Sequence, residues 1–95
     1  MHIVARSCRV KVIFNENKPE NWKNDLLSLC QNINARVLKV LPSGDDIVLV
    51  SLDINDAEKL FSEDATAKLS DMGGKALMPY VIKAGWSLLL SLIHI

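Results

Sequence analysis

The sequence has few of the residues that chemistry at a thiol or a metal ion requires. Its two cysteines, Cys8 and Cys30, and its two histidines, His2 and His94, lack the spacing of a metal-binding motif. It also has no nucleophile motif, no glycine-rich phosphate loop and no carboxylate pair with a reason to be buried. We therefore expect a protein that is not an enzyme, without cofactor or metal, whose two cysteines are free thiols.

Aromatic residues, net charge and long apolar runs are also scarce. Aromatic residues make up 5% of the chain and the formal net charge is zero, so the whole-molecule field does not attract nucleic acid or membranes. No apolar run approaches the roughly 20 residues that a membrane-spanning helix needs. The N-terminus lacks the apolar run of a signal peptide. We expect an intracellular protein, cytoplasmic or nuclear, with no membrane partner.

The composition is that of one globular domain. Hydrophobic residues make up 49% and charged residues 23% of the 95 residues. We place this domain at residues 1–84 and expect residues 85–95 to be a non-native read-through tail. Residues 90–95 are what the bases CTG TCT CTT ATA CAC ATC would encode, and these bases match the end of a widely used transposase sequencing adapter. The alternative is a natural apolar segment that docks on the domain or on a partner.

The first strand and helix are indicated by two different periods. In residues 9–15, Val10, Val12 and Phe14 alternate with Arg9, Lys11 and Ile13, which predicts a strand with one buried face and one face carrying charge, around which the rest of the chain is organised. Asn17 can cap a helix, with Pro19 in its first turn and Glu20 bonding back. An apolar stripe then runs from Trp22 to Ile33 at helical spacing, and it predicts the helix face that packs on the sheet.

A hairpin and a second helix follow. Residues 35–41 and 47–52 are rich in aliphatic residues and are joined by a short polar loop, which predicts an antiparallel hairpin. The second helix is predicted from a cap at Asn55 to about Met72, with room for a break near Ser62.

The last strand completes the predicted fold. It covers residues 75–83 after the helix-ending Gly73-Gly74, and Pro79, which lacks an amide donor, places it at an edge of the sheet. The order of elements predicts an α+β fold, the ferredoxin-like βαββαβ sandwich, in which two helices cover one face of a four-stranded antiparallel sheet.

Charge is distributed unevenly along the chain. Residues 1–40 hold seven Lys or Arg against three Asp or Glu, residues 41–72 hold two against eight, and residues 73–95 hold two against none. The acidic residues gather on the outer face of the second predicted helix, at Asp56, Glu58, Glu63, Asp64 and Asp71.

Alternation with a period of two assigns each strand residue to a face of the sheet. The face toward the helices is predicted to hold Val10, Val12, Phe14, Leu38, Val40, Val48, Val50 and Leu52. The open face is predicted to hold Arg9, Lys11, Ile13, Val37, Lys39, Ile47, Leu49 and Ser51. The last strand adds either Tyr80 and Ile82 or Val81 and Lys83. The open face is therefore expected to be basic and aliphatic.

In element order, residues 9–83 resemble the RNA-recognition-motif family, which stacks bases on aromatics of its first and third strands. Here the third strand, IVLVSLD, has no aromatic, and Phe14 of the first strand is predicted to be in the core. More loosely, the βαββαβ unit with a short Pro-Tyr strand looks like the RNA-recognition-like domains of gag-like proteins of non-LTR retrotransposons. The resemblance implies binding of single-stranded RNA or DNA, and the candidate residues are Arg9, Lys11, Lys39, Tyr80 and Lys83.

Two other functions fit the same predicted fold. The run NENKPENW and the segment after it are similar to the small-molecule-sensing ACT domain, where a Pro-Gly turn opens the first helix and an Asn-Ile pair precedes the second strand. Pro19 and Asn32-Ile33 match this pattern, whereas the glycine position is Glu20, which would crowd a ligand. The other alternative is a protein-protein or oligomerisation module, which would use the open face for an acidic protein partner or for self-association.

Overall fold

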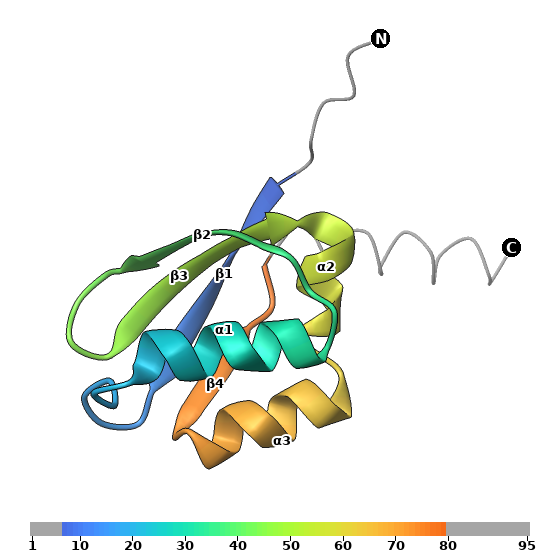
Figure 1. Cartoon of the computed structure of the whole chain (residues 1–95). Helices are drawn as coiled ribbons and strands as arrows, with labels where there is room; N and C mark the ends of the chain where they lie inside the picture. Colours follow the sequence, from blue (N-terminus) through green and yellow to red (C-terminus); the bar gives the residue numbers. More distant parts are fainter. Residues whose placement is uncertain (1–6, 80–95) are drawn as a thin grey trace, which may run out of the picture.

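The computed structural model describes residues 7–79, which form one antiparallel sheet with helices on one of its faces (Figure 1). The strands are β1 (Ser7–Phe14), β2 (Val37–Pro42), β3 (Ile47–Asp53) and β4 (Gly74–Leu77). The helices are α1 (Trp22–Asn32), α2 (Ile54–Lys59) and α3 (Glu63–Asp71). The strands lie in the order β2-β3-β1-β4, and every neighbouring pair is antiparallel. The predicted α+β class and four-stranded antiparallel sheet are confirmed.

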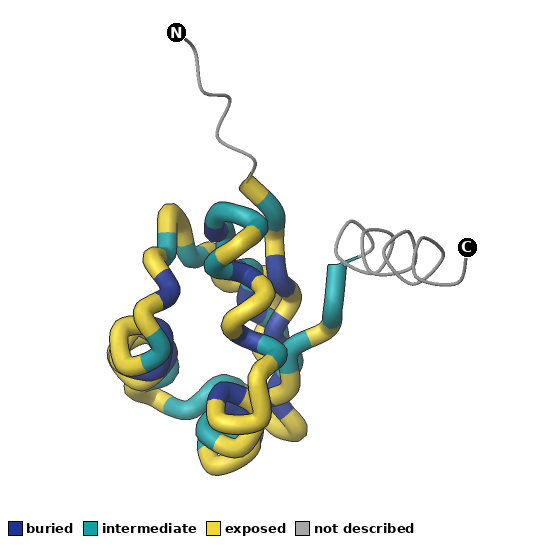
Figure 2. The backbone as a smooth tube through the Cα atoms, turned by 90° about the vertical axis from the view of Figure 1, so that its right-hand side faces the viewer, coloured by how far each residue is buried: buried dark blue, intermediate teal, exposed yellow. Residues whose placement is uncertain are grey.

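The core lies between the sheet and the helices, where alternate strand residues meet the apolar helix stripes. Buried and exposed positions alternate along the chain in Figure 2, as the periods of strands and amphipathic helices require. The strands contribute Val10, Val12, Phe14, Val48, Val50 and Leu52. The helices and the turn before β2 contribute Leu26, Leu29, Cys30, Ala35, Ala57, Leu60, Ala65 and Leu69.

A β-bulge in β2 changes two of the predicted faces. Val37 pairs with Leu52, and Lys39 pairs with Ser51, the residue next to Leu52. Leu38 therefore has no partner in β3 and is the extra residue of the bulge. Leu38 is 53% exposed, although alternation predicted it in the core. Val37, predicted on the open face, packs against the core instead. Both predictions were wrong because strict alternation fails wherever one strand carries an extra residue.

The first helix begins later than the sequence predicted. α1 starts at Trp22, and its N-cap is Asn21 and not the predicted Asn17. The Asn21 side chain makes no capping hydrogen bond. Pro19 accounts for part of the difference, because a proline disfavours helical backbone conformations at the residue before it, here Lys18.

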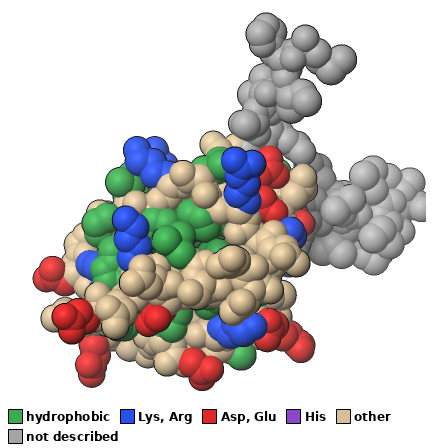
Figure 3. All heavy atoms as spheres, in the orientation of Figure 1, with side chains coloured by type: hydrophobic (Ala, Val, Ile, Leu, Met, Phe, Trp, Pro, Cys, Tyr) green, Lys and Arg blue, Asp and Glu red, His purple; other side chains and the backbone are tan. Residues whose placement is uncertain are grey.

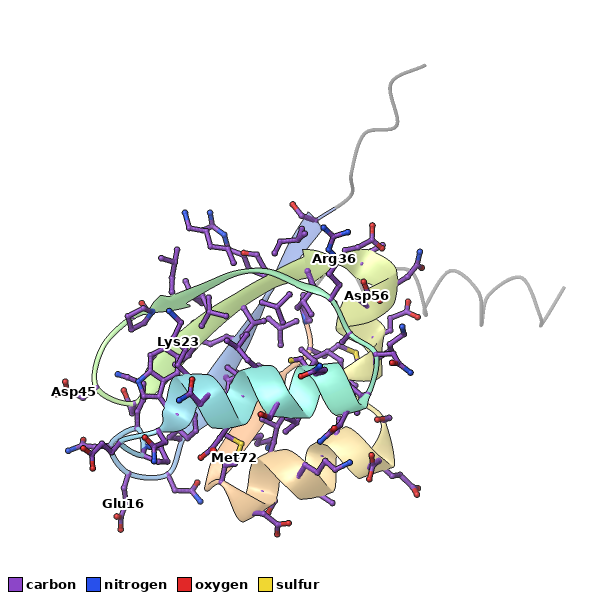
Figure 4. All side chains as sticks on the ribbon, in the orientation of Figure 1. Glu16, Lys23, Arg36, Asp45, Asp56 and Met72 are labelled. Carbon is purple, nitrogen blue, oxygen red and sulfur yellow. The ribbon has the colours of Figure 1, made fainter. Side chains whose placement is uncertain are left out.

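Lys18 also joins the loop before α1 to the tip of the β2–β3 hairpin. Its backbone N–H donates to the carbonyl of Asp45 at 2.8 Å, and its ammonium donates to the carbonyl of Gly44. Figure 4 shows Asp45 at this tip. A residue held in this way is not free to enter the helix.

The second predicted helix is two helices. Asp53 rather than Asn55 caps α2, since its carboxylate accepts the Asn55 backbone N–H at 2.9 Å. Ser62 caps α3 in the same manner, accepting the Ala65 N–H at 3.2 Å. The predicted break near Ser62 is thereby confirmed, and its cause is a new N-cap inside the helical segment.

β4 is shorter than predicted. It forms the edge of the sheet beside β1, as Pro79 indicated, but it begins at Gly74 and ends at Leu77. Tyr80, Lys83 and the predicted read-through tail, residues 85–95, lie outside the described residues. No helix within residues 7–79 is long and apolar enough to cross a membrane.

Candidate functional site

The sheet face opposite the helices, here called the open face, contains three central rows of residues set by the strand register, and a further row, Ser7 and Asp53, lies at its end. The first row is Lys39, Ser51 and Arg9 on β2, β3 and β1. The second row is Leu41, Leu49, Lys11 and Leu77 on β2, β3, β1 and β4. The third row is Ile47, Ile13 and Lys75 on β3, β1 and β4. Antiparallel pairing puts directly opposite residues on the same face, so these side chains share one surface.

Four cations of this face are exposed and lack an acidic partner within residues 7–79. The structure gives two ion pairs in this range, Lys59 with Asp56 at 3.1 Å and Lys68 with Asp64 at 2.8 Å, and both lie on the helices. The three rows contain no Asp or Glu, and Asp53 in the next row lies diagonal to Arg9 without forming an ion pair with it. The open face therefore has a net positive charge, which is carried by Arg9, Lys11, Lys39 and Lys75.

The four cations form a stepped line across the sheet. Arg9 and Lys39 lie on either side of β3, about 10 Å apart at the usual strand spacing. Lys11 follows Arg9 by two residues along β1, about 7 Å away. Lys75 is diagonal to Lys11, about 8 Å away, because it pairs with Ile13. Each step is about one Debye length at physiological salt or less, so the four charges act jointly on an approaching anion.

An aliphatic area lies beside this line. Leu41 and Leu77 are 38% and 41% exposed, and Ile13, Ile47 and Leu49 are half-buried. Figure 3 shows the opposite, helical side of the molecule, where Asp and Glu side chains line the lower rim. A contiguous apolar area bordered by charge is typical of a binding surface.

The acid on the open face is Asp53, which lies opposite Ser7 at the end of the sheet and whose carboxylate caps α2. Asp45 and Asp46 lie in the β2–β3 hairpin loop, directly before Ile47 of the third row. The helices carry Asp25, Asp56, Glu58, Glu63, Asp64 and Asp71.

The structure brings together Arg9, Lys11 and Lys39, three of the five predicted site residues. Tyr80 and Lys83 lie outside the described residues. Lys75 was missed, because the sequence left open which residues of the last strand face the helices. The structure settles this: a Cβ at Gly74 would lie 3.2 Å from the Phe14 ring, so Gly74 faces the core and Lys75 faces the open side.

The two cysteines are free thiols, as predicted, and their environment keeps them protonated. Burial raises the pKa of Cys30 from 9.0 to about 11. The pKa of Cys8 is also raised, mainly by burial and further by the charges of Asp53 and Glu58. Protonated thiols are poor nucleophiles and poor metal ligands. Within residues 7–79 no three His, Cys, Asp or Glu side chains gather as a metal site.

The Cys30 pKa predicts a measurable pH dependence of stability. The folded-state pKa is higher than the unfolded one, so the stabilisation is complete below pH 9.0 and is lost as pH rises toward about 11. Across this window the free energy of unfolding should fall by about 1.4 kcal/mol per pH unit relative to Cys30→Ala. Urea unfolding of both proteins at several pH values measures this difference, and parallel curves would contradict it.

A hollow of about 360 Å³ lies where the ACT resemblance places a ligand, at the start of α1. Lys18, Glu20, Trp22 and Asp45 contribute to its lining. The Lys18 ammonium lies 5.9 Å from the centroid of the Trp22 ring and also binds the Gly44 carbonyl. The cation and the aromatic of this hollow are thus already engaged with each other.

Comparisons with known proteins add no further constraint. No family model, no curated protein and no solved structure matches this chain. The open face has to be interpreted from its own chemistry.

Proposed function

We propose that the chain is a non-catalytic, RNA-recognition-motif-like module of the ferredoxin-like βαββαβ class, and that its open face binds single-stranded nucleic acid. The observation that carries this proposal is the line of four exposed cations without an acidic neighbour in the three rows. Lys and Arg side chains that contact phosphates release condensed counterions, and this release drives binding. The strand order β2-β3-β1-β4 supports the fold assignment, with α2 and α3 together in the place of the second helix.

The mixture of side chains favours a single strand over a duplex. A duplex presents phosphates on a convex surface and keeps its bases stacked inside. On a duplex, the aliphatic area of the open face would therefore lie against charged phosphates. A single strand exposes both phosphates and the apolar faces of its bases. It can therefore place phosphates on the cations while sugars and bases cover Leu41, Leu49 and Ile47.

Self-association through the open face has less support. Pairing two copies face to face would bring both sets of four cations together with no carboxylate from the three rows between them. Like charges in an interface cost several kcal/mol. An acidic protein would not meet this repulsion, and the experiment below distinguishes it from nucleic acid. No feature of the hollow at α1 favours the ACT-like alternative.

Salt dependence tests the proposal directly. We expect the protein to bind a fluorescent single-stranded RNA or DNA of about 12 nucleotides, a length within the usual site sizes. Four phosphate contacts predict a slope of about −2.8 in log K against log salt, so the affinity should fall about 50-fold between about 50 and 200 mM salt. Fluorescence anisotropy over this range measures the slope.

The same titration has two informative controls. Lys23→Gln, on α1 (Figure 4), removes one exposed cation from the helical side and should leave the affinity and slope unchanged. Poly-glutamate as a competitor represents an acidic protein. The proposal fails if neither RNA nor DNA binds at about 50 mM salt, or if poly-glutamate binds as tightly as the oligonucleotide at equal charge.

A further inference from the structure

We infer that the open face binds the phosphate backbone of a single strand and not its bases, so that it accepts strands without regard to sequence. This inference rests on the proposed function and specifies how the ligand is recognised. Three properties of the described residues carry it: where the aromatic rings lie, which polar groups the face offers, and how its cations are spaced.

The aromatic rings of residues 7–79 do not lie on the open face. Phe14 is 3% exposed and belongs to the core. Trp22 and Phe61 are half-buried and pack against that core from the helical segments, and the Trp22 ring also faces the ammonium of Lys18. Stacking on aromatic rings is the usual way in which a protein sheet holds single-stranded bases. The three rows provide no ring for this purpose.

The open face also has few groups that could distinguish one base from another. Adenine is read by the paired donor and acceptor of Asn or Gln, cytosine by the acceptors of Asp or Glu, and guanine by Arg or Lys. Asn, Gln, Asp and Glu do not occur in the three rows, where the one uncharged polar side chain is Ser51, half-buried between Arg9 and Lys39. The four cations are the groups that could contact a base edge, and we assign them to phosphates because of their spacing. The aliphatic residues can cover any base or sugar, because contacts with them have no directional requirement.

The cations, by contrast, are spaced to follow a chain of phosphates. They cross the sheet from Lys39 on β2 through Arg9 and Lys11 on β1 to Lys75 on β4. Their Cα atoms are about 7 to 10 Å apart, and long side chains can extend their charged ends toward successive phosphates. The path includes every cation of the three rows, so the strand would run from one edge of the sheet toward the other.

Three oligonucleotides of equal length separate backbone from base recognition. The first is oligo-dT, the second an abasic strand that keeps every phosphate, and the third a strand with bases on a neutral methylphosphonate backbone. We expect the abasic strand to bind the full chain within about threefold of oligo-dT, and the neutral strand to bind at least about 50-fold more weakly. Because the full chain is used, any contribution from Tyr80 is included.

Two variants extend the test to single residues. Lys75→Gln should reduce the salt slope for oligo-dT by about 0.7, whereas Lys23→Gln should not change it. Ser51→Ala should leave the ratio of the affinities for oligo-dT and oligo-dA unchanged. An abasic strand that binds at least about tenfold more weakly than oligo-dT would overturn the inference and leave the proposed function standing. Failure of oligo-dT itself to bind would overturn the proposed function.

Discussion

Replacing Arg9, Lys11 and Lys39 together by glutamate is expected to abolish nucleic-acid binding, with a loss of at least about 100-fold at about 100 mM salt. The change leaves Lys75 as the one cation in the three rows and adds three carboxylates to them. Three phosphate contacts are lost, and the new carboxylates repel the phosphates that remain nearby. Fluorescence anisotropy with the oligonucleotide that binds the wild-type protein measures the loss.

The controls for this variant address folding and position. All three side chains are exposed, so the free energy of unfolding should change by no more than about 0.5 kcal/mol for each, and circular dichroism should be unchanged. Lys11→Glu should weaken binding clearly more than Lys23→Glu, since both variants change net charge equally and only Lys11 lies on the open face. A triple variant that stays folded and binds like the wild type would refute the assignment of the open face.

Phe14→Ala is expected to have the largest effect on stability, about 3–5 kcal/mol. The ring is 3% exposed, and a Cβ at Gly74 would lie only 3.2 Å from it, so β1 and β4 are closely packed at this point. Removing the ring would leave a cavity between the sheet and the helices that these neighbours cannot fill without moving. Against the 5–15 kcal/mol that is typical of a whole domain, such a loss is large. Thermal and urea unfolding measure it.

Phe14→Leu separates this structural role from a role in binding. Leucine fills much of the same volume, so the variant should stay folded with a loss of about 1–2 kcal/mol. Its affinity for single strands should equal that of the wild type, because Phe14 faces away from the open face. A folded Phe14→Leu protein with impaired binding would show that the ring takes part in recognition, as aromatic residues of first strands do in the family that the sequence resembles.

The residues of the central strands β1 and β3 could be assigned to faces from the sequence because no bulge interrupts the alternation of their side-chain directions. In β1 and β3 every predicted core residue, from Val10 to Leu52, is buried, and the placement of Arg9 and Lys11 follows from the same register. The helix stripes were predictable for the same reason, since one apolar face was enough to identify each of them.

The rest depended on contacts between segments that are distant in the sequence. The bulge at Leu38 is defined by how β2 pairs with β3, so the sequence of β2 alone does not indicate it. The late start of α1 follows from the bonds between Lys18 and the hairpin tip. Lys75 could be placed only once Gly74 was known to meet Phe14. Local periods predict the faces, whereas tertiary contacts set the ends and irregularities of the elements.

The two outer strands are poor templates for the growth of a larger sheet. β2 is interrupted by the bulge at Leu38 and ends at Pro42, which has no amide to donate, and β4 is four residues long. Bulges, prolines and short strands at sheet margins hinder backbone pairing between molecules. If many copies were crowded along one polymer at high local concentration, these margins would oppose their fusion into fibrils, and the copies would remain separately folded.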